Sequence, residues 1–434
     1  ILCMLAASNW SRLTSRTRGS FCHSAHSGRW SALGRLIRPS AMAGVVTPHG
    51  SSQKTLLLNI GNVTSVLSEV VRELSCGKSG VLNVFTCGTD AAMAVHAAAV
   101  SDDVRKTAMS VGGGSGECAA AILGHSCNVP VRDGKLMCGD DLILHSFGKS
   151  GADAEEEVVA TFTPATASAG PANLKSRGGG VCDLVTRDIA AVNFDSKAAN
   201  DNFSLVHVTL GGGPTSVCIN ENADPDVRVD LAGALQRIAP RGALAAAIVG
   251  GSLAVPCGSG GRPGLGTWQG LYLNNHGDIR EAPFTKTSTE VCAQTTITAT
   301  APKRGCHDIT SQVEGALAKM GGASAEGGAV HIFIKHTSAS LCVGGAASLD
   351  TLETALSDAV PERWNREFFR HTMEGDDDMP AHVKHTLLGA GCVIPAVGEK
   401  LSLGAGQRVL LCEHRNAGGW GGGHARQVVV SVIA

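Results

Sequence analysis

The sequence predicts an α+β protein that consists of three tandem modules, at about residues 53–150, 155–285 and 288–434. Two observations support this prediction. Short β-branched strands alternate with helices that carry apolar residues at three- and four-residue spacing, and the order of these elements recurs along the chain. The clearest internal match pairs "LGHSCNVPVRDGKL" at 123–136 with "LGAGCVIPAVGEKL" at 388–401. A chain of 434 residues also has room for about three domains of ordinary size.

The last module shows the predicted order most fully. We expect strands at 289–302 and 329–336, helices at 304–320 and 349–360, and a closing hairpin formed by "QRVLLCEHR" and "ARQVVVSVI". The middle module repeats the order, beginning with the strand "EEEVVATFTPA", and the first module repeats it more faintly. A repeated order of elements indicates duplicated units. The predicted domain boundaries therefore follow the three copies of this order.

Composition excludes several classes of protein. A net charge of -2 gives no basic surface of the kind that nucleic-acid binding requires. The most apolar run, residues 243–258, is shorter than the ~20 residues that span a bilayer, so we expect a soluble protein with no membrane span. Fifteen cysteines occur singly, without a C-x-x-C pair, which is typical of reduced thiols in an intracellular compartment.

Residues 1–50 differ from the rest of the chain. They contain six arginines and many serines but no Asp or Glu, as organellar transit peptides do. If residues 1–41 are translated, we expect a mitochondrial or plastid protein. If translation starts at Met42, we expect a cytoplasmic one.

Several long motifs resemble one known family. These are "FIKHTSASL", "HTMEGDDDMPAHVK", "LLGAGCVIP" and "LLCEHR" in the last module, and "NENADPDV" and "LGTWQG" in the middle one. They look like the YjbQ family, whose bacterial members are described as secondary thiamine-phosphate synthases. The resemblance implies β-sandwich-like α+β subunits that form homotrimers. Three tandem copies would then close as an intramolecular pseudo-trimer. The alternative is three separate domains on a string.

The resemblance also implies a histidine site in the last module. His336, His371 and His382 are the expected metal ligands, for a divalent ion such as zinc or magnesium. Glu374 would orient a ligand or act as a general base, beside His371 and His414 as further catalytic residues. Lys384 would receive a substrate phosphate.

Simpler roles exist for neighbouring residues. Asp376, Asp377 and Asp378 suit the positive end of a helix that has Pro380 in its first turn and ends at Gly389. His385 is expected at the surface.

No single module carries the whole family pattern. The last module keeps the histidines but has "GGAASLDT" and "GAGQR" where the middle module keeps the expected substrate-binding residues, which are Asn220, Glu221, Asn222, Asp224, Trp268 and Gln269. The middle and first modules have Gly212 and Gly88 at the position of the first histidine.

Two explanations remain open. In one, a single composite site forms between neighbouring modules and keeps its chemistry on a small phosphorylated substrate. In the other, activity has lapsed and the chain serves as a structural subunit, with protein partners in a larger organellar assembly.

Overall fold

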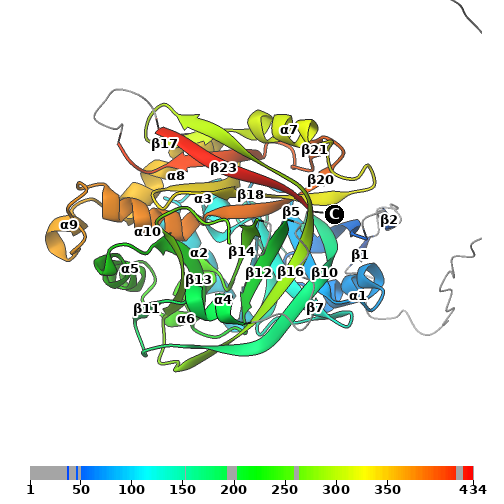
Figure 1. Cartoon of the computed structure of the whole chain (residues 1–434), viewed down its shortest axis with the longest axis horizontal. Helices are drawn as coiled ribbons and strands as arrows, with labels where there is room; N and C mark the ends of the chain where they lie inside the picture. The colour runs from blue at the N-terminus through cyan, green and yellow to red at the C-terminus, as the bar shows by residue number, and fades with distance from the viewer. Residues whose placement is uncertain are drawn as a thin grey trace, which may run out of the picture. The chain divides into compact units, whose positions relative to one another are not determined.

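A computed structural model describes residues 37–38, 45–46, 50–151, 153–192, 203–258, 263–416 and 424–433 (Figure 1). The described residues from Ile37 onward belong to one compact unit, so the alternative of separate domains on a string does not describe this part of the chain. The expected targeting segment at residues 1–41 and Met42 lie almost wholly outside the described residues.

Three antiparallel ladders share the same pairing order and are joined into one antiparallel sheet. In each ladder, the last of four strands in chain order pairs with the first and with the second, and the second pairs with the third; β10 and β16 also serve as the first strands of the second and third ladders. The strands are β3 (Ser52–Asn59), β5 (Gly80–Thr86), β7 (Ser126–Arg132) and β10 (Glu155–Lys175); β12 (Ser204–Leu210), β14 (Ser252–Cys257) and β16 (Glu281–Ala301); and β18 (Gly328–Ile334), β20 (Gly391–Val397) and β23 (His424–Ile433). Short strands extend the edges, namely β1 (Ile37–Arg38), β2 (Val45–Val46), β8 (Lys135–Leu136) and β21 (Lys400–Leu401).

The two longest strands each serve two ladders. The first part of β10 pairs with β3 and β5, and its second part pairs with β16. The first part of β16 pairs with β10 and β12, and its second part pairs with β23. Figure 1 shows both as long curved ribbons. "EEEVVATFTPA" therefore closes the first ladder instead of opening the second, because one uninterrupted strand joins the two.

Three smaller sheets repeat in the same way. They are β4 (Gly61–Asn62), β9 (Asp141–Ser146) and β6 (Ala91–His96); β11 (Val181–Leu184), β15 (Gln269–Asn275) and β13 (Thr215–Glu221); and β17 (Gly305–Asp308), β22 (Arg408–Glu413) and β19 (Ala339–Gly344). In each set the middle strand pairs with both others.

Helices accompany each set of strands. They are α1 (Thr64–Ser75), α2 (Ser101–Val111) and α3 (Gly116–Leu123); α4 (Thr186–Ala191), α5 (Pro225–Ile238) and α6 (Gly242–Val249); and α7 (Thr310–Lys319), α8 (Ala346–Ala359), α9 (Trp364–Glu367) and α10 (Asp378–Leu388), with a 3-10 turn at Ala98–Val100. Helices of different sets touch, as α2 touches α6, α5 touches α10, and α3 touches α8. No helix of the described residues is long and apolar enough to cross a membrane.

The ends of α5 and α10 follow from local sequence. Asp224 caps α5 by accepting a hydrogen bond from the Asp226 amide, and Pro225 occupies the first turn, where its missing N–H costs nothing. Helix α10 begins at Asp378 and ends at Leu388, and it is followed by the C-cap residue Gly389, whose φ of 90° favours glycine. The predicted acidic start and glycine stop of α10 are confirmed.

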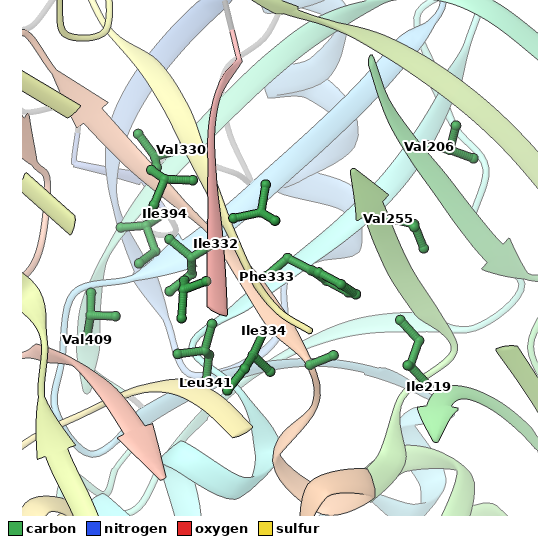
Figure 2. Packing of buried hydrophobic residues seen from close by; sticks show 14 of the residues in the cluster. Val206, Ile219, Val255, Val330, Ile332, Phe333, Ile334, Leu341, Ile394 and Val409 are labelled. Atoms are coloured by element: carbon green, nitrogen blue, oxygen red, sulfur yellow. The ribbon is translucent and has the colours of Figure 1, made fainter. Parts of the chain in front are cut away.

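The hydrophobic core runs across the three ladders. We call the three sets of strands, with their helices, the first, middle and last segments. Figure 2 shows Val206, Ile219 and Val255 of the middle segment and Phe333 and Ile334 of the last segment in one buried cluster. Phe85 of the first segment belongs to the same cluster. This shared burial holds the three segments together, because apolar area removed from water is the main favourable term in folding.

A glutamine joins neighbouring segments at two places. Gln269 Nε2 donates to the carbonyls of Ile334 (2.9 Å) and His336 (2.8 Å), while its Oε1 accepts from the Gly266 amide. Gln407 repeats this arrangement one segment further on, donating to the carbonyls of Thr86 (2.9 Å) and Gly88 (3.1 Å) and accepting from the Gly404 amide. We call these contacts the middle–last clamp and the last–first clamp.

Candidate functional site

A buried cluster of imidazoles and carboxylates lies where the middle segment meets the last. Glu221 stands at the end of β13, and His382 lies in the first half of α10. His382 Nε2 is 3.1 Å from Glu221 Oε2 and 3.5 Å from Asp378 Oδ2. The side chains of His382 and Asp378 are 1% and 2% exposed, so the ionisable groups of these two residues are shielded from solvent.

His371 adds a second imidazole to the cluster. Its Nδ1 lies 2.6 Å from Asp224 Oδ2 and its Nε2 lies 2.8 Å from Asp378 Oδ2. The hydrogen bond to Asp378, helped by the one to Asp224, raises the pKa of His371 to about 9. Burial alone would raise the pKa of Asp378, but the two imidazoles and Arg415 hold it well below its usual range. His371 is therefore an imidazolium between two carboxylates.

The orientation of His382 is fixed from the other side of its ring. Its Nδ1 is 2.9 Å from the carbonyl oxygen of Thr337, so Nδ1 carries the proton and donates it. Nε2 faces Glu221 and Asp378. Burial lowers the pKa of His382, but the hydrogen bonds to Asp378 and Glu221 raise it above its ordinary value, which favours a proton on Nε2 as well. Backbone carbonyls fix the tautomer of metal-ligating histidines in the same way.

Within the described part of the chain, two groups have the geometry to hold a metal ion. One is Glu221, His371 and His382, and the other is His371, Glu374 and Asp378, with the ligand atoms of each group within 4.8 Å of one another. Glu221 and the histidines come from different segments, so the first group exists only because these segments meet.

The predicted ligand His336 lies outside both groups. Its Nδ1 accepts a hydrogen bond from the Ser338 amide, and Arg426 Nη1 lies 2.6 Å from its Nε2. Burial and the Arg426 charge lower the pKa of His336 to about 3. Of the predicted set His336, His371 and His382, the structure brings His371 and His382 together with Glu221 instead of His336, because the guanidinium of Arg426 lies against Nε2 of His336.

Two predicted catalytic residues form a separate buried network instead. Lys384 Nζ donates to Glu353 Oε1 at 2.8 Å, and His414 Nδ1 lies 2.6 Å from Glu353 Oε2. The side chains of Lys384 and His414 are both fully buried. Lys384 is thus not placed to receive a phosphate, and His414 bonds to Ser340 and Glu353 and not to the cluster.

His385 also differs from its prediction. It is fully buried, not at the surface, and its Nδ1 donates to the Ala339 carbonyl at 2.7 Å. The side chain of Glu374 is exposed near His371, and its backbone carbonyl accepts a hydrogen bond from Arg415.

The expected substrate-binding residues divide into two kinds. Asn220 and Gln269 join the segments, since Asn220 Nδ2 donates to the His382 carbonyl (2.9 Å) and to Thr386 Oγ1 (2.8 Å). Asn222 donates to the Gln269 carbonyl beside them. Trp268 is 61% exposed next to the middle–last clamp, and so remains open to a ligand.

Sequence reasoning missed two residues that support the cluster. Asp230 of α5 is 2% exposed, and its Oδ2 accepts from the amides of Arg370 (2.6 Å) and His371 (2.9 Å). Arg415 holds the acidic loop: it pairs with Asp377 and Asp378 and donates to the Glu374 carbonyl at 2.7 Å. A carboxylate among the buried positions Val227 and Leu231 of α5 was the available signal for Asp230.

The fold and the cluster define a class: a tandem α+β protein whose histidine and carboxylate side chains meet between two of its segments. The family described as "UPF0047 protein YjbQ-like" matches residues 172–289 and 294–434, which together make up more than half of the chain. The chain therefore belongs to the YjbQ-like UPF0047 family, which it contains in tandem, as its motifs predicted.

Individual relatives match one segment each. UPF0047 protein YjbQ of Escherichia coli O157:H7 is 35% identical over 129 residues, which is 29% of this chain and 90% of the relative. UPF0047 protein sll1880 of Synechocystis sp. is 35% identical over 132 residues, covering 30% of this chain and 83% of the relative. A conserved hypothetical protein of Thermus thermophilus, of known structure, is 31% identical with a TM-score of 0.26, covering 31% and 97% of the two chains.

Proposed function

We propose that the chain binds one divalent metal ion between its middle and last segments, with Glu221, His371 and His382 as ligands. The observation that carries this proposal is the orientation of His382, whose Nδ1–H donates to the Thr337 carbonyl and whose Nε2 faces Glu221 and Asp378, where a metal ion would displace its proton. Two nitrogens and an oxygen suit zinc, which leaves a further position for substrate or water. A bound divalent ion would polarise a phosphate or carbonyl oxygen of the substrate.

The surrounding residues are suited to hold and move protons. Asp378 joins the two imidazoles, while Arg415 and Ser338 Oγ contact its other oxygen. His371 has two ring protons, one facing Asp224 and one facing Asp378. Metal binding would replace one of them. Glu374, exposed beside His371, would exchange protons with a bound molecule.

The substrate class that we propose is a small phosphorylated molecule, in a reaction similar to that of a secondary thiamine-phosphate synthase. The family resemblance supports this class. Exposed Trp268 supports it further, because an exposed indole face would stack on a planar heterocycle such as the pyrimidine of such a substrate. Lys384 takes no part in this proposal.

Metal content tests the site directly. Purified chain dialysed against Zn²⁺ should retain about one ion by elemental analysis, and Glu221→Gln and His382→Ala should each lower that stoichiometry at least fivefold. His307→Ala, which removes an imidazole outside the cluster, should leave it unchanged. Wild-type protein that retains no ion at micromolar Zn²⁺ overturns the metal proposal.

Activity needs a separate test. Expression in a thiamine-requiring bacterial strain should restore growth, and Glu221→Gln should abolish the rescue. If the wild type binds metal but fails to rescue at any expression level, the metal site stands and the synthase-like reaction does not.

A structural role is the second candidate, and the two glutamine clamps favour it. We propose that the three sets of strands close on one another as a pseudo-trimer, with Gln269 and Gln407 at two equivalent junctions. Asp140 Oδ2, which accepts from the Gly213 amide at 3.1 Å, occupies the third. Light scattering should then give a monomer near 44 kDa. A homotrimer of the full chain would contradict closure within one chain.

An organellar location is the remaining proposal, and it rests on the arginine- and serine-rich composition of residues 1–50. Residues 1–50 fused to a fluorescent protein should direct it to mitochondria or plastids. A diffuse cytoplasmic signal would contradict this proposal and favour translation from Met42. A structural role in a larger assembly further predicts that the tagged full chain migrates well above its own mass in organelle extract.

A further inference from the structure

Three buried thiols of the last segment come together on one face of its small sheet. Cys306 lies in β17, Cys342 lies in β19, and Cys412 lies between them in the middle strand β22; all three are free thiols. The sulfur of Cys412 is 3.2 Å from that of Cys306 and 3.7 Å from that of Cys342. None of the three belongs to the proposed metal site.

The pairing of the strands singles out Cys306 and Cys412 as a pair that an S–S bond can join. Cys306 is directly opposite Cys412 in the antiparallel ladder, whereas Cys342 is opposite Leu410. Residues directly opposite each other have Cα atoms about 4.5–5.5 Å apart, which lies within the range of about 4.4–6.8 Å found in disulfides. An S–S bond of about 2.0 Å therefore requires the two sulfurs to approach by only about 1 Å. Cys342 is diagonal to Cys412, and diagonal residues are about 7–8 Å apart, which is beyond that range.

The middle segment has the equivalent sheet with a different residue at the centre. Cys182 of β11 is in the position equivalent to Cys306, but the residue opposite it is Asn274, where the last segment has Cys412. Asn274 Nδ2 donates to the sulfur of Cys218 in β13 at 3.3 Å. Both segments thus bury thiols at this place, but in the last segment one thiol is directly opposite another.

Cys306 is the thiol of the pair that an oxidant reaches first. It lies in a four-residue strand at the edge of its sheet, and short edge strands open locally more easily than central ones. Cys306 is 8% exposed, whereas Cys412 is fully buried. The hydrogen bond with Cys412 lowers the pKa of Cys306, although burial keeps it above its ordinary value; the hydrogen bonds with Cys306 and Cys342, together with burial, raise the pKa of Cys412 well above its usual range. Cys306 therefore ionises before Cys412, and the thiolate is the reactive form.

We propose that Cys306 and Cys412 form a reversible intramolecular disulfide when the protein meets a hydroperoxide, and that Cys342 stays reduced. With hydrogen peroxide, the Cys306 thiolate attacks one oxygen and the O–O bond breaks. That oxygen stays on the sulfur as a sulfenic acid, and the other oxygen leaves as water with the thiol proton. The Cys412 sulfur then attacks the sulfenic sulfur, the S–S bond forms, and the hydroxyl leaves as water with the Cys412 proton. Two thiols and one peroxide thus give one disulfide and two waters, and a dithiol reductant reverses the step.

Treatment of the wild-type, full-length chain with a small molar excess of hydrogen peroxide tests the proposal. The remaining thiols are then alkylated in denaturant, and mass spectrometry of a non-reducing digest should show Cys306 linked to Cys412 and Cys342 alkylated. Dithiothreitol should remove the linkage. The oxidised protein should melt about 5 °C or more above the reduced protein, because a cross-link over a long loop constrains the unfolded chain. The proposal is overturned if Cys306 and Cys412 are still alkylated once the exposed Cys292 has been oxidised, or if Cys412 is linked to Cys342 instead.

The middle segment supplies the matched control within the same molecule. Cys182 and Cys218 are also buried, and both should remain alkylated in the wild-type digest, which needs no variant to fold. Asn274→Cys, which places a thiol opposite Cys182, should add a second linkage, whereas Cys412→Asn should abolish the first. Linkage of Cys182 to Cys218 in the wild type would overturn the argument from directly opposed thiols. Glu221→Gln should form the same disulfide as the wild type, so the result is independent of the metal site.

Discussion

The middle–last and last–first junctions share a backbone arrangement but differ in chemistry. Gln269 and Gln407 make the same three kinds of contact, each with two carbonyls of the next segment and one amide of its own. At the first junction, Glu221 then meets His382. At the second, Gly345 lies against Glu117, which accepts from the Ala347 amide at 2.7 Å. The two junctions therefore differ in the side chains at the position of the site, but they share the glutamine contacts that join the segments.

The largest expected effect comes from closing the space at the last–first junction. A Cβ at Gly404 would overlap the carbonyl oxygen of Cys87, which is backbone and cannot move aside. We expect Gly404→Val to lower the free energy of unfolding by about 4 kcal/mol or more, or to prevent folding. Gly266→Val at the middle–last junction should cost less, since its Cβ would lie 3.0 Å from the Lys335 carbonyl.

Chemical denaturation of both variants measures this difference. Gly315→Val is the control for β-branching in a helix, because its Cβ would have no neighbour within 4 Å. Equal losses at Gly404 and Gly266 would contradict the tighter packing of the last–first junction.

The next effect separates the buried network of the last segment from the metal cluster. Glu353→Ala leaves Lys384 and His414 buried without their carboxylate, which in other proteins costs about 3–5 kcal/mol of stability. Zn²⁺ binding by the folded fraction should be retained, because Glu353 contacts none of the proposed ligands.

The double variant Glu353→Ala, Lys384→Met is the control for this prediction. It removes the unpaired ammonium and should recover part of the lost stability. Loss of Zn²⁺ binding in an otherwise folded single variant would instead couple the network to the cluster.

More of the fold than of the candidate site could be predicted from the sequence. The repeated order of strands, and the acidic start and glycine stop of α10, follow from periodicity and local capping, which depend on neighbours in sequence. The partition of β10 and β16 between ladders could not be predicted, since an uninterrupted run of strand-forming residues does not show where its partner changes.

The cluster was predicted in part for a similar reason. The motifs identified His371, His382 and Glu221, and the idea of a composite site brought them together. His336 and Lys384 have the right chemistry for a site, but they are in contact with Arg426 and Glu353 instead. Those partners lie 90 and 31 positions away in sequence, and no local pattern marks them.

Low pH should destabilise all three segments. The loss in free energy of unfolding should grow with the number of buried neutral histidines. Burial lowers the pKa of His207 and His331 to about 3 and that of His125 to about 4. The unfolded chain therefore binds more protons than the folded chain below about pH 6.5, so stability falls as the pH falls. One such group costs about 2–3 kcal/mol at pH 4.5.

Urea denaturation at pH 7.5 and pH 4.5 measures this loss. His331→Phe should lose less stability than the wild type between the two pH values. His307→Phe, at a more exposed position, should follow the wild type. An identical pH dependence in all three proteins would mean that His331 is not buried in its neutral form.

The smallest expected effect is that of removing one glutamine clamp, and it distinguishes the roles of the two clamps. Gln269→Ala and Gln407→Ala each remove two donated hydrogen bonds and leave buried carbonyls with fewer partners, at a cost of about 1–3 kcal/mol. The two losses of stability should agree within a factor of two, because the contacts are equivalent. Zn²⁺ affinity should differ: it should fall several-fold in Gln269→Ala, since this clamp sets the position of β13 and Glu221 against α10, and stay unchanged in Gln407→Ala. Equal Zn²⁺ affinities would show that Asn220 alone, through the His382 carbonyl and Thr386, aligns the two halves of the site.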